Sequence, residues 1–357
     1  MSKALLTIIV PTLNRSAFII RLLNYLAHTN YKHCIAIGDS SDGFHVEKTK
    51  EAIKTIGKKL EIVYSEFPGL SCHATQKQLI QSVATPYIVS LPDDDFLVPD
   101  GLDKCIEFLE THPDYVAAHG VGVIVTFKAG EPYGKDLLID NYRQPIIEKE
   151  SATERLVELL EKYSVPVFSV HRTAAFRVMW FDKIDNYAFG ELLPCCLSVI
   201  LGKIKHLNGF YLVRQNHGER YLSPDLYDWI TNARWQSSYE VLQNCLTEEL
   251  SKRENITLDE AKQIFKQGFW AYLIMQLSTH YKGQYEPTIL VDIKQVVKNI
   301  PFVNNILRSI LRSIRQQWLS TGNISLPALL NPRSPYHNDF MPIYRAIRNA
   351  PEKAGKE

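Results

Sequence analysis

Two patterns of apolar residues alternate along the first hundred positions of the chain. Short runs of β-branched residues and leucine, typical of buried parallel strands, are separated by stretches in which apolar residues recur at helical spacing. The patterns predict strands over 5–10, 33–38, 60–64 and 87–91, and helices over 16–28, 46–56 and 70–83. Strands joined through helices imply right-handed crossovers. We therefore predict an α/β fold, a Rossmann-like, mostly parallel sheet flanked by helices.

The pattern becomes helical in the second half of the chain. The sheet region continues with a helix over 101–110, a strand-rich segment over 116–127, an irregular stretch over 128–150, a helix over 151–163 and a strand over 204–213. The rest is nearly all helical in pattern, with helices expected over 227–250, 258–281, 288–297 and 303–318. We predict a domain over 1–222 that holds the sheet and a mostly helical C-terminal region over 223–357.

Composition and charge narrow the class of protein. Hydrophobic residues make up 45% and charged residues 22%, a globular balance that excludes intrinsic disorder. The formal net charge of +1 and the lack of a basic motif in the sheet region argue against a nucleic-acid partner. The six cysteines form no C-x-x-C pair, and Pro11 cuts the first apolar run short. We therefore expect reduced thiols and a cytoplasmic protein.

Polar residues follow the predicted strands, and sheets of this kind bind ligands at the carboxyl ends of their strands. The most charged of these positions carries Asp93, Asp94 and Asp95 after the fourth strand. Three adjacent carboxylates raise one another's pKa unless a cation or hydrogen-bond donors neutralise them. A divalent metal held by one or two carboxylates and substrate phosphates would do so. The alternative is a solvated turn with an Asp as N-cap of the next helix.

Three motifs at successive strand ends resemble the family 2 glycosyltransferases. They are TIIVPTLNR ending at Arg15, IAIGDSSD ending at Asp42 and YIVSLPDDDFLVP ending at Pro99. The similarity covers about the first hundred residues and is faint beyond them until Glu191. The resemblance implies a GT-A fold, a UDP-, GDP- or dTDP-sugar donor, Mn²⁺ or Mg²⁺ as cofactor, and inversion at the anomeric carbon.

The resemblance also implies a set of residues that bind the nucleotide sugar. Pro11 and Thr12 would flank the nucleoside, and Asp39 would accept a hydrogen bond from the base. Gln76 and Lys77 stand where the family often shows Arg-Asn; Lys77 could instead neutralise a phosphate, and a solvent-facing helix lysine is the favoured alternative. The full set is Pro11, Thr12, Asn14, Arg15, Asp39, Asp42, Lys77, Asp93, Arg214 and Arg220, the two last arginines being candidate partners of the diphosphate.

The acidic run corresponds to the family's metal-binding D-x-D motif with one departure. Pro92 stands where many members have the first Asp, so two registers remain, with Asp94 or Asp95 as the direct ligand, and we favour Asp94. Related GT-A enzymes often supply a histidine after the last strand as a further metal ligand, and His217 stands there. A surface or structural histidine is the alternative.

An inverting transfer needs a base that takes the proton of the acceptor hydroxyl. The resemblance places this base at the start of a helix after the sheet, where Glu191 is the sole carboxylate. A glutamate in a first turn also favours the helix dipole, which explains Glu191 without catalysis. Asp182 and Asp185 are the competing candidates.

These inferences predict a glycosyltransferase that moves a sugar to an acceptor hydroxyl. By analogy with the family, the acceptor is a glycan or a lipid-linked glycan in bacterial surface-polysaccharide assembly. A catalytically inactive protein that binds sugar nucleotides, or serves as a scaffold, is the alternative. A nucleotidyltransferase is disfavoured because the loop after the first strand lacks glycine.

The C-terminal region is basic from residue 296. It carries nine Lys or Arg and three Asp or Glu, a net charge of +6, which leaves −5 for residues 1–295. Over 301–318, apolar residues at helical spacing end at Trp318, with Arg308, Arg312 and Arg315 on or beside the other face. The pattern is typical of a helix in the headgroup layer, here at the inner face of a membrane. The alternative is a helix packed on the domain or on a second subunit of a homo-oligomer.

Overall fold

The first hundred residues alternate between strand and helix as predicted. The computed structural model describes residues 4–29, 31–57, 59–128, 130–180, 189–219, 226–285 and 324–348. Its first elements are β1 (Leu6–Thr12), α1 (Ser16–Ala27), β2 (Cys34–Asp39), α2 (Gly43–Ile56), β3 (Glu61–Glu66), α3 (Cys72–Ser82) and β4 (Tyr87–Ser90). Each predicted strand and helix of this stretch is confirmed, with boundaries that differ by one to three residues.

Parallel pairing dominates the sheet. The later strands are β5 (Phe96–Leu97), β6 (Tyr115–Phe127), β7 (Leu137–Tyr142), β8 (Val170–Arg172) and β9 (Lys203–Asn216). The order is β3-β2-β1-β4-β8-β6-β9-β5, with β7 paired to β6 outside this path. β3, β2, β1 and β4 are parallel, as are the long strands β6 and β9. Antiparallel pairing is confined to β5, β7 and β8 with their neighbours, so the predicted mostly parallel sheet is confirmed.

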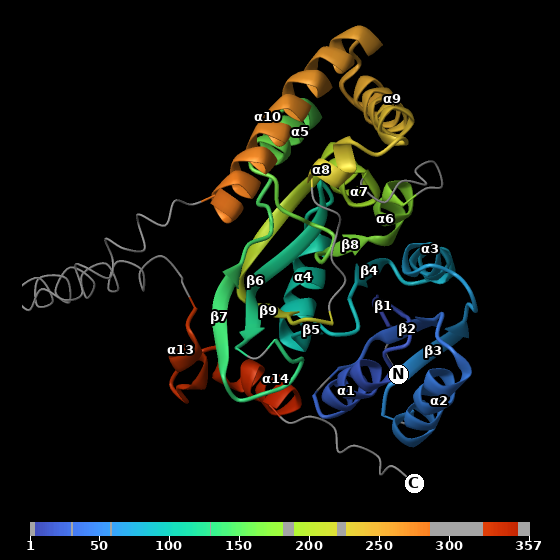
Figure 1. The fold of residues 1–357 in the computed structure, drawn as a ribbon, viewed down its shortest axis with the longest axis vertical. Helices are drawn as coiled ribbons and strands as arrows, with labels where there is room; N and C mark the ends of the chain where they lie inside the picture. The colour runs from blue at the N-terminus through green and yellow to red at the C-terminus, as the bar shows by residue number, and fades with distance from the viewer. Residues whose placement is uncertain are drawn as a thin grey trace, which may run out of the picture.

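Both faces of the sheet are covered by helices (Figure 1). In β1, Ile8 and Val10 belong to one core and Ile9 to the other, the alternation expected of a strand buried on both faces. The helices on the first face include α1, α4 (Pro99–Thr111), α13 (Leu326–Leu330) and α14 (His337–Arg348). Those on the second face include α3, α5 (Ala152–Glu161), α6 (Thr173–Met179), α7 (Phe189–Leu201), α9 (Trp235–Glu254) and α10 (Leu258–Tyr285).

Two predicted elements were wrong. The stretch 128–150, expected to be irregular, contains β7, which pairs with β6 from Gly122↔Tyr142 to Phe127↔Leu137. The helix expected over 227–250 is divided into α8 (Leu226–Ile230) and α9. The side chain of Asn232 accepts a hydrogen bond from the Arg234 N–H at 2.9 Å and so favours a turn between them. The helices expected over 288–297 and 303–318 lie outside the described residues.

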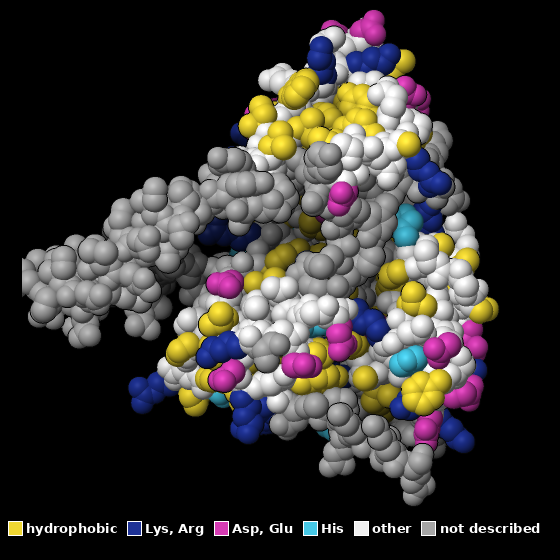
Figure 2. Space-filling model, in the orientation of Figure 1, with side chains coloured by type: hydrophobic (Ala, Val, Ile, Leu, Met, Phe, Trp, Pro, Cys, Tyr) yellow, Lys and Arg dark blue, Asp and Glu magenta, His cyan; other side chains and the backbone are white. Residues whose placement is uncertain are grey.

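The C-terminal helices pack on the same sheet. α10 packs on α5, and at Gly268 an added Cβ atom would stand 2.7 Å from Leu160 Cδ1. On the opposite face, Phe340 and Ile343 of α14 join the core formed with α1 and α4. The outer face of α10 exposes Trp270, Ile274 and Leu277, and hydrophobic side chains gather over α9 and α10 in Figure 2. No helix in the described part of the chain is long and apolar enough to cross a bilayer.

Candidate active site

A tight turn after β4 carries the acidic triad, which we define as Asp93, Asp94 and Asp95. The Asp95 N–H donates to the carbonyl oxygen of Pro92 at 3.2 Å, which closes the turn before β5. The triad lies beyond the carboxyl end of β4, next to β1 in the sheet. All three residues are almost fully buried, with exposed fractions of 3%, 6% and 1%. Carboxylates this buried need partners that compensate for the lost water.

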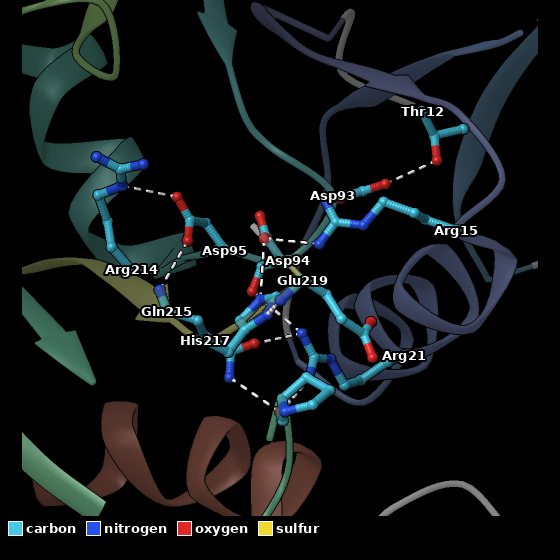
Figure 3. A network of polar contacts seen from close by, with 11 residues as sticks. Thr12, Arg15, Arg21, Asp93, Asp94, Asp95, Arg214, Gln215, His217 and Glu219 are labelled. Carbon is cyan, nitrogen blue, oxygen red and sulfur yellow. Dashed lines mark hydrogen bonds and ion pairs between the residues drawn. The ribbon is translucent and has the colours of Figure 1, made fainter. Parts of the chain in front are cut away.

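The partners of Asp93 and Asp94 come from the end of β1 and from the loop after β9 (Figure 3). Asp93 accepts a hydrogen bond from Thr12 Oγ1 at 2.7 Å and pairs with Arg15 Nη1 at 2.9 Å. Asp94 pairs with Arg15 Nη2 at 2.8 Å and contacts His217 Nε2 at 3.1 Å, both through Oδ2. Thr12, Arg15 and His217, all predicted site residues, therefore meet at the triad.

Two residues of β9 bind the Asp95 carboxylate. Its Oδ2 pairs with Arg214 Nε and its Oδ1 accepts the N–H of Gln215, both at 2.8 Å. Arg214 also donates to the Tyr142 hydroxyl at 3.2 Å and lies over the rings of Tyr142 and Phe168. Arg214, predicted to meet a diphosphate, thus stands beside the triad with a fifth of its side chain exposed.

The protein shifts the pKa values of the three carboxylates in different directions. Burial raises the pKa of Asp93 to about 7, although the Arg15 charge opposes the shift. Burial also raises the pKa of Asp95, against the opposing charge of Arg214. For Asp94, burial is outweighed by His217 and Arg15, which together hold the pKa of this carboxyl well below its usual range. Asp94 is therefore the member of the triad that stays ionised most firmly.

Arg21 and Gln215 support the triad from inside the protein, and neither was predicted. Arg21 Nη2 donates to the Asp94 carbonyl oxygen at 3.1 Å and to Gln215 Oε1, and Nη1 donates to the Pro132 carbonyl oxygen at 3.3 Å. Its guanidinium lies over the rings of Phe18, Phe96 and Tyr133. The available signal was an arginine on the apolar face of the predicted helix 16–28.

The Phe18 ring packs against two residues of the site, Arg15 and His217. Its ring lies 4.3 Å from the Arg15 guanidinium carbon and stacks on the His217 ring, with 5.4 Å between the ring centroids. The N–H of Glu219 donates to His217 Nδ1 at 3.2 Å. A ring whose Nδ1 accepts carries its proton on Nε2, so His217 donates to Asp94 here.

Glu191 stands in the first turn of α7 with its side chain exposed. The Tyr163 hydroxyl donates to Glu191 Oε1 at 3.1 Å. Although the residue is exposed to solvent, the protein around its carboxyl group desolvates that group in part and so raises its pKa, while the Tyr163 hydrogen bond and the Arg214 charge lower it. Because Arg214 also pairs with Asp95, the candidate base and the triad share this arginine as a neighbour. Asp182, Asp185 and Arg220 lie outside the described residues.

Comparisons with known proteins identify the family. The model of the family described as Glycosyl transferase family 2 matches residues 7–185. The chain belongs to glycosyl transferase family 2. No curated protein sequence matches it.

Solved structures show the fold of this glycosyltransferase. The crystal structure of S. aureus TarS residues 1–349 in complex with UDP-GlcNAc has 14% identity and a TM-score of 0.51, over 79% of this chain and 76% of that chain. The same TarS fragment with UDP has 14% identity and a TM-score of 0.46, over 82% and 78%. The mannosyltransferase PcManGT from Pyrobaculum calidifontis, with GDP-Man and Mn²⁺, has 10% identity and a TM-score of 0.42, over 85% and 83%. The predicted GT-A fold is confirmed.

Asp94 and His217, two of the residues predicted as metal ligands, lie side by side in the glycosyltransferase. Asp94 Oδ2 and His217 Nε2 are 3.1 Å apart. Two adjacent ligands of an octahedral ion, each ~2.1 Å from the metal, are about 3.0 Å apart. The described residues contain no cluster of three or more His, Cys, Asp or Glu that could hold a metal. In the arrangement observed, Nε2 carries a proton and donates it to Asp94, so a cation would fit here only if His217 takes the other tautomer and frees Nε2; phosphate oxygens and water would supply the remaining ligands.

Asp39 is buried at the end of β2 with both oxygens engaged. Its Oδ1 accepts the N–H of Ser41 and its Oδ2 accepts the Tyr64 hydroxyl proton, both at 2.9 Å. Burial, and then the hydrogen bond to Asp39, raise the pKa of Tyr64, which keeps this hydroxyl protonated. Tyr64, a residue of β3, was not predicted, and its hydroxyl engages the predicted base-binding carboxylate.

The remaining predicted residues of the glycosyltransferase lie in the loops after β1 and β2, in β1 itself and on α3. Asn14 has a φ of 55°, donates its N–H to Ser41 Oγ at 2.7 Å, and accepts the Asp42 N–H at 2.8 Å. Asp42 is the N-cap of α2. Pro11 pairs with Gly38 across β1 and β2, and Lys77 lies half-buried on α3. Asn14 and Asp42 therefore have structural contacts that account for them without a ligand.

Proposed function

We propose that the protein transfers a sugar from a nucleotide-sugar donor to an acceptor hydroxyl with inversion, and that Glu191 is the general base. The observation that carries the proposal is the cluster at the carboxyl end of β4, where Arg15 pairs with Asp93 and Asp94 and Arg214 pairs with Asp95. Glu191, in the first turn of α7, is the carboxylate that the family resemblance indicates as the base. A base and a diphosphate-binding centre on either side of one reacting sugar are what a direct displacement requires.

The donor is proposed to be a UDP-, GDP- or dTDP-sugar. TarS, which shares the fold, was solved with UDP-GlcNAc. In this chain the diphosphate would meet Arg15 and Arg214, with Arg220 as a further partner, and the nucleoside would lie near Pro11, Thr12 and Asp39. Buried Arg15 Nε has no hydrogen-bond acceptor among the described residues, and a phosphate oxygen would supply one.

Asp94 and His217 would hold Mn²⁺ or Mg²⁺ beside the diphosphate. The cation, when bound, stabilises the negative charge of the departing nucleotide. Arg15 and Arg214 supply further positive charge at the same place. Glu191 removes the proton of the acceptor hydroxyl as the new bond forms, and its raised pKa makes it a stronger base than a solvated glutamate.

The acceptor and setting are proposed from the family alone. A glycan or lipid-linked acceptor, a hexosyl donor group and a role in bacterial surface-polysaccharide assembly follow from that analogy. We place the enzyme in the cytoplasm, at the inner face of the membrane when it meets a lipid-linked acceptor.

A panel of UDP-, GDP- and dTDP-sugars tests the proposed donor. Hydrolysis of each sugar is measured with Mn²⁺ and with EDTA, beside calorimetric binding of the nucleoside diphosphate. We expect one nucleotide class to bind and its sugar to be cleaved only with the cation. Binding of a nucleotide without turnover of any of its sugars, with or without added acceptors, would favour the scaffold alternative.

Replacement of the base tests the proposed chemistry. Glu191→Gln keeps the side-chain shape but cannot accept the proton, so kcat should fall by ~10²–10⁴-fold while the Kd of the donor is unchanged. Asp182→Asn and Asp185→Asn are the matched variants. Normal turnover of Glu191→Gln, together with loss of turnover in one of the other two, would move the base to that residue.

A further inference from the structure

We propose that Tyr163 is a positioning residue that holds the Glu191 carboxylate for proton transfer, and that helix α10 fixes Tyr163 through Tyr272. This inference rests on the proposed function, in which Glu191 is the base. It assigns the C-terminal helical region a part in the reaction although that region supplies none of the predicted site residues. The sequence offered no motif for it.

The first observation is the hydrogen bond to the base. The Tyr163 hydroxyl donates to Glu191 Oε1 at 3.1 Å, from a residue that follows the end of α5. Glu191 is exposed in the first turn of α7, where a free glutamate would occupy several rotamers. A single donor on one carboxylate oxygen restricts those rotamers and leaves the other oxygen to accept a proton.

The second observation is the support behind Tyr163. Its ring meets the ring of Tyr272 edge to face, with centroids 5.1 Å apart and an interplanar angle of 81°. Tyr272 is 7% exposed and packs in turn on Phe269 of the same helix and on Trp229. One turn before Tyr272, Gly268 lets α10 approach Leu160 of α5, three residues ahead of Tyr163. Tyr163 is thus held in place by α5, which it follows, and by α10 through Tyr272.

Two described groups act on the Glu191 carboxylate: Tyr163 is a neutral hydrogen-bond donor, and Arg214 is a cation. The charge of Arg214 on β9 lowers the pKa of Glu191, and burial raises the pKa of Tyr142 on β7 to about 12. Burial likewise raises the pKa values of Tyr163, of Tyr272 on α10 and of Cys195 on α7, so these groups stay neutral near pH 7. The Tyr163 hydrogen bond lowers the pKa of Glu191, and its removal therefore raises it.

The variant Tyr163→Phe tests the positioning role because it keeps the ring and removes the hydroxyl. We expect kcat/KM to fall roughly 10- to 100-fold, as for the loss of a hydrogen bond to a charged group. The acidic limb of the kcat/KM profile should move to higher pH, because the base now loses its proton later. Tyr272→Leu, which removes the supporting ring, should shift the limb in the same direction. A purely structural role would lower activity at every pH without moving the limb.

Tyr239→Phe is the matched control. Its ring belongs to the same aromatic cluster. Among the described contacts, its hydroxyl accepts a hydrogen bond only from Gln243, on its own helix. We expect an unchanged pH profile for Tyr239→Phe. In a Glu191→Gln background, Tyr163→Phe should add no further loss of rate, since a residue that acts through Glu191 has nothing left to position.

The outcomes separate this inference from the proposed function. Full activity of Glu191→Gln would overturn the role of the base itself. An inactive Glu191→Gln beside a Tyr163→Phe variant with the wild-type profile would leave the base and overturn the positioning role. Additive losses in the double variant would also overturn it. Thermal melting of each variant confirms that the chain is folded before its rate is compared.

Discussion

Asp94 and Asp95 are adjacent in sequence but occupy opposite environments. The Asp94 side chain is 8% exposed, and its Oδ2 contacts Arg15, which keeps about a fifth of its side chain exposed, and His217, whose side chain is fully buried. The Asp95 side chain is 1% exposed, and its oxygens are bound by Arg214 and by the Gln215 backbone. Asp94 therefore keeps more contact with solvent than Asp95, which orients Arg214, and we predict that a cation binds at Asp94.

The variants Asp94→Asn and Asp95→Asn should separate these roles. Asp95→Asn breaks a buried ion pair and should cost about 3 kcal/mol of the free energy of unfolding, the low end for such pairs because Arg214 keeps some contact with solvent. Asp94→Asn removes a carboxylate that Arg15 and His217 stabilise in the folded state, so it should also lower the free energy of unfolding, and it should abolish binding of Mn²⁺ in the presence of the nucleoside diphosphate. Chemical denaturation measures the first effect and electron paramagnetic resonance of Mn²⁺ the second. Mn²⁺ binding that is retained in Asp94→Asn, or lost in Asp95→Asn and not in Asp94→Asn, would contradict this division.

Residue types at strand ends could be predicted, but their partners could not. Periodicity locates the end of a strand, and it placed Thr12, Arg15 and Asp94 at one edge of the sheet. The contact between Arg21 and Gln215 joins residues 194 positions apart, and no spacing in the sequence encodes it. The contact of Tyr163 could not be predicted from the sequence either, because its partner, Glu191, lies on another helix. The predicted roles of these site residues remain predictions.

Elements were predictable where burial on both faces imposes a continuous apolar run. This holds for β1, β2 and β4, whose residues are all buried. β7 carries the polar residues Asp140 and Asn141 and pairs with β6 outside the main order of strands, so its pattern resembles a loop. β8 spans only three residues, which is too short for periodicity to register. The interruption between α8 and α9 depends on one side-chain hydrogen bond.

The contact between α5 and α10 depends on Gly268. A Cβ atom there would stand 2.7 Å from Leu160, which is fully buried and has little room to move. Gly268→Val should therefore lower the free energy of unfolding by about 1–3 kcal/mol, the usual cost of overpacking a core. Calorimetry measures the shift in Tm, and the rate should fall with it because α10 supports Tyr163. Gly43→Ala, where an added Cβ meets no atom within 4 Å, is the control. A Gly268→Val protein as stable as the wild type would show that the helices separate without cost.

The whole molecule divides its charge between a slightly acidic body and a basic C-terminal region. Residues from 296 onward carry a net charge of +6 against −5 for residues 1–295. Part of this region, α14, packs on the sheet, and its Arg345 and Arg348 are exposed there. The amphipathic pattern over 301–318 lies outside the described residues, so contact with a membrane stays a prediction from the sequence.

Sedimentation with vesicles tests that prediction. Each arginine near an anionic surface contributes ~1 kcal/mol, which salt screens. The protein should therefore pellet with anionic vesicles at low salt, and less so when Arg308, Arg312 and Arg315 are changed to Gln. The matched control changes Arg333, Arg345 and Arg348 to Gln, an equal loss of charge from exposed positions outside the amphipathic pattern. If the pattern rather than the overall charge binds lipid, the control should pellet almost as well as the wild type. Equal losses in the two triple variants would assign binding to net charge. Equal sedimentation with neutral and anionic vesicles, or none with either, would favour a helix packed on protein.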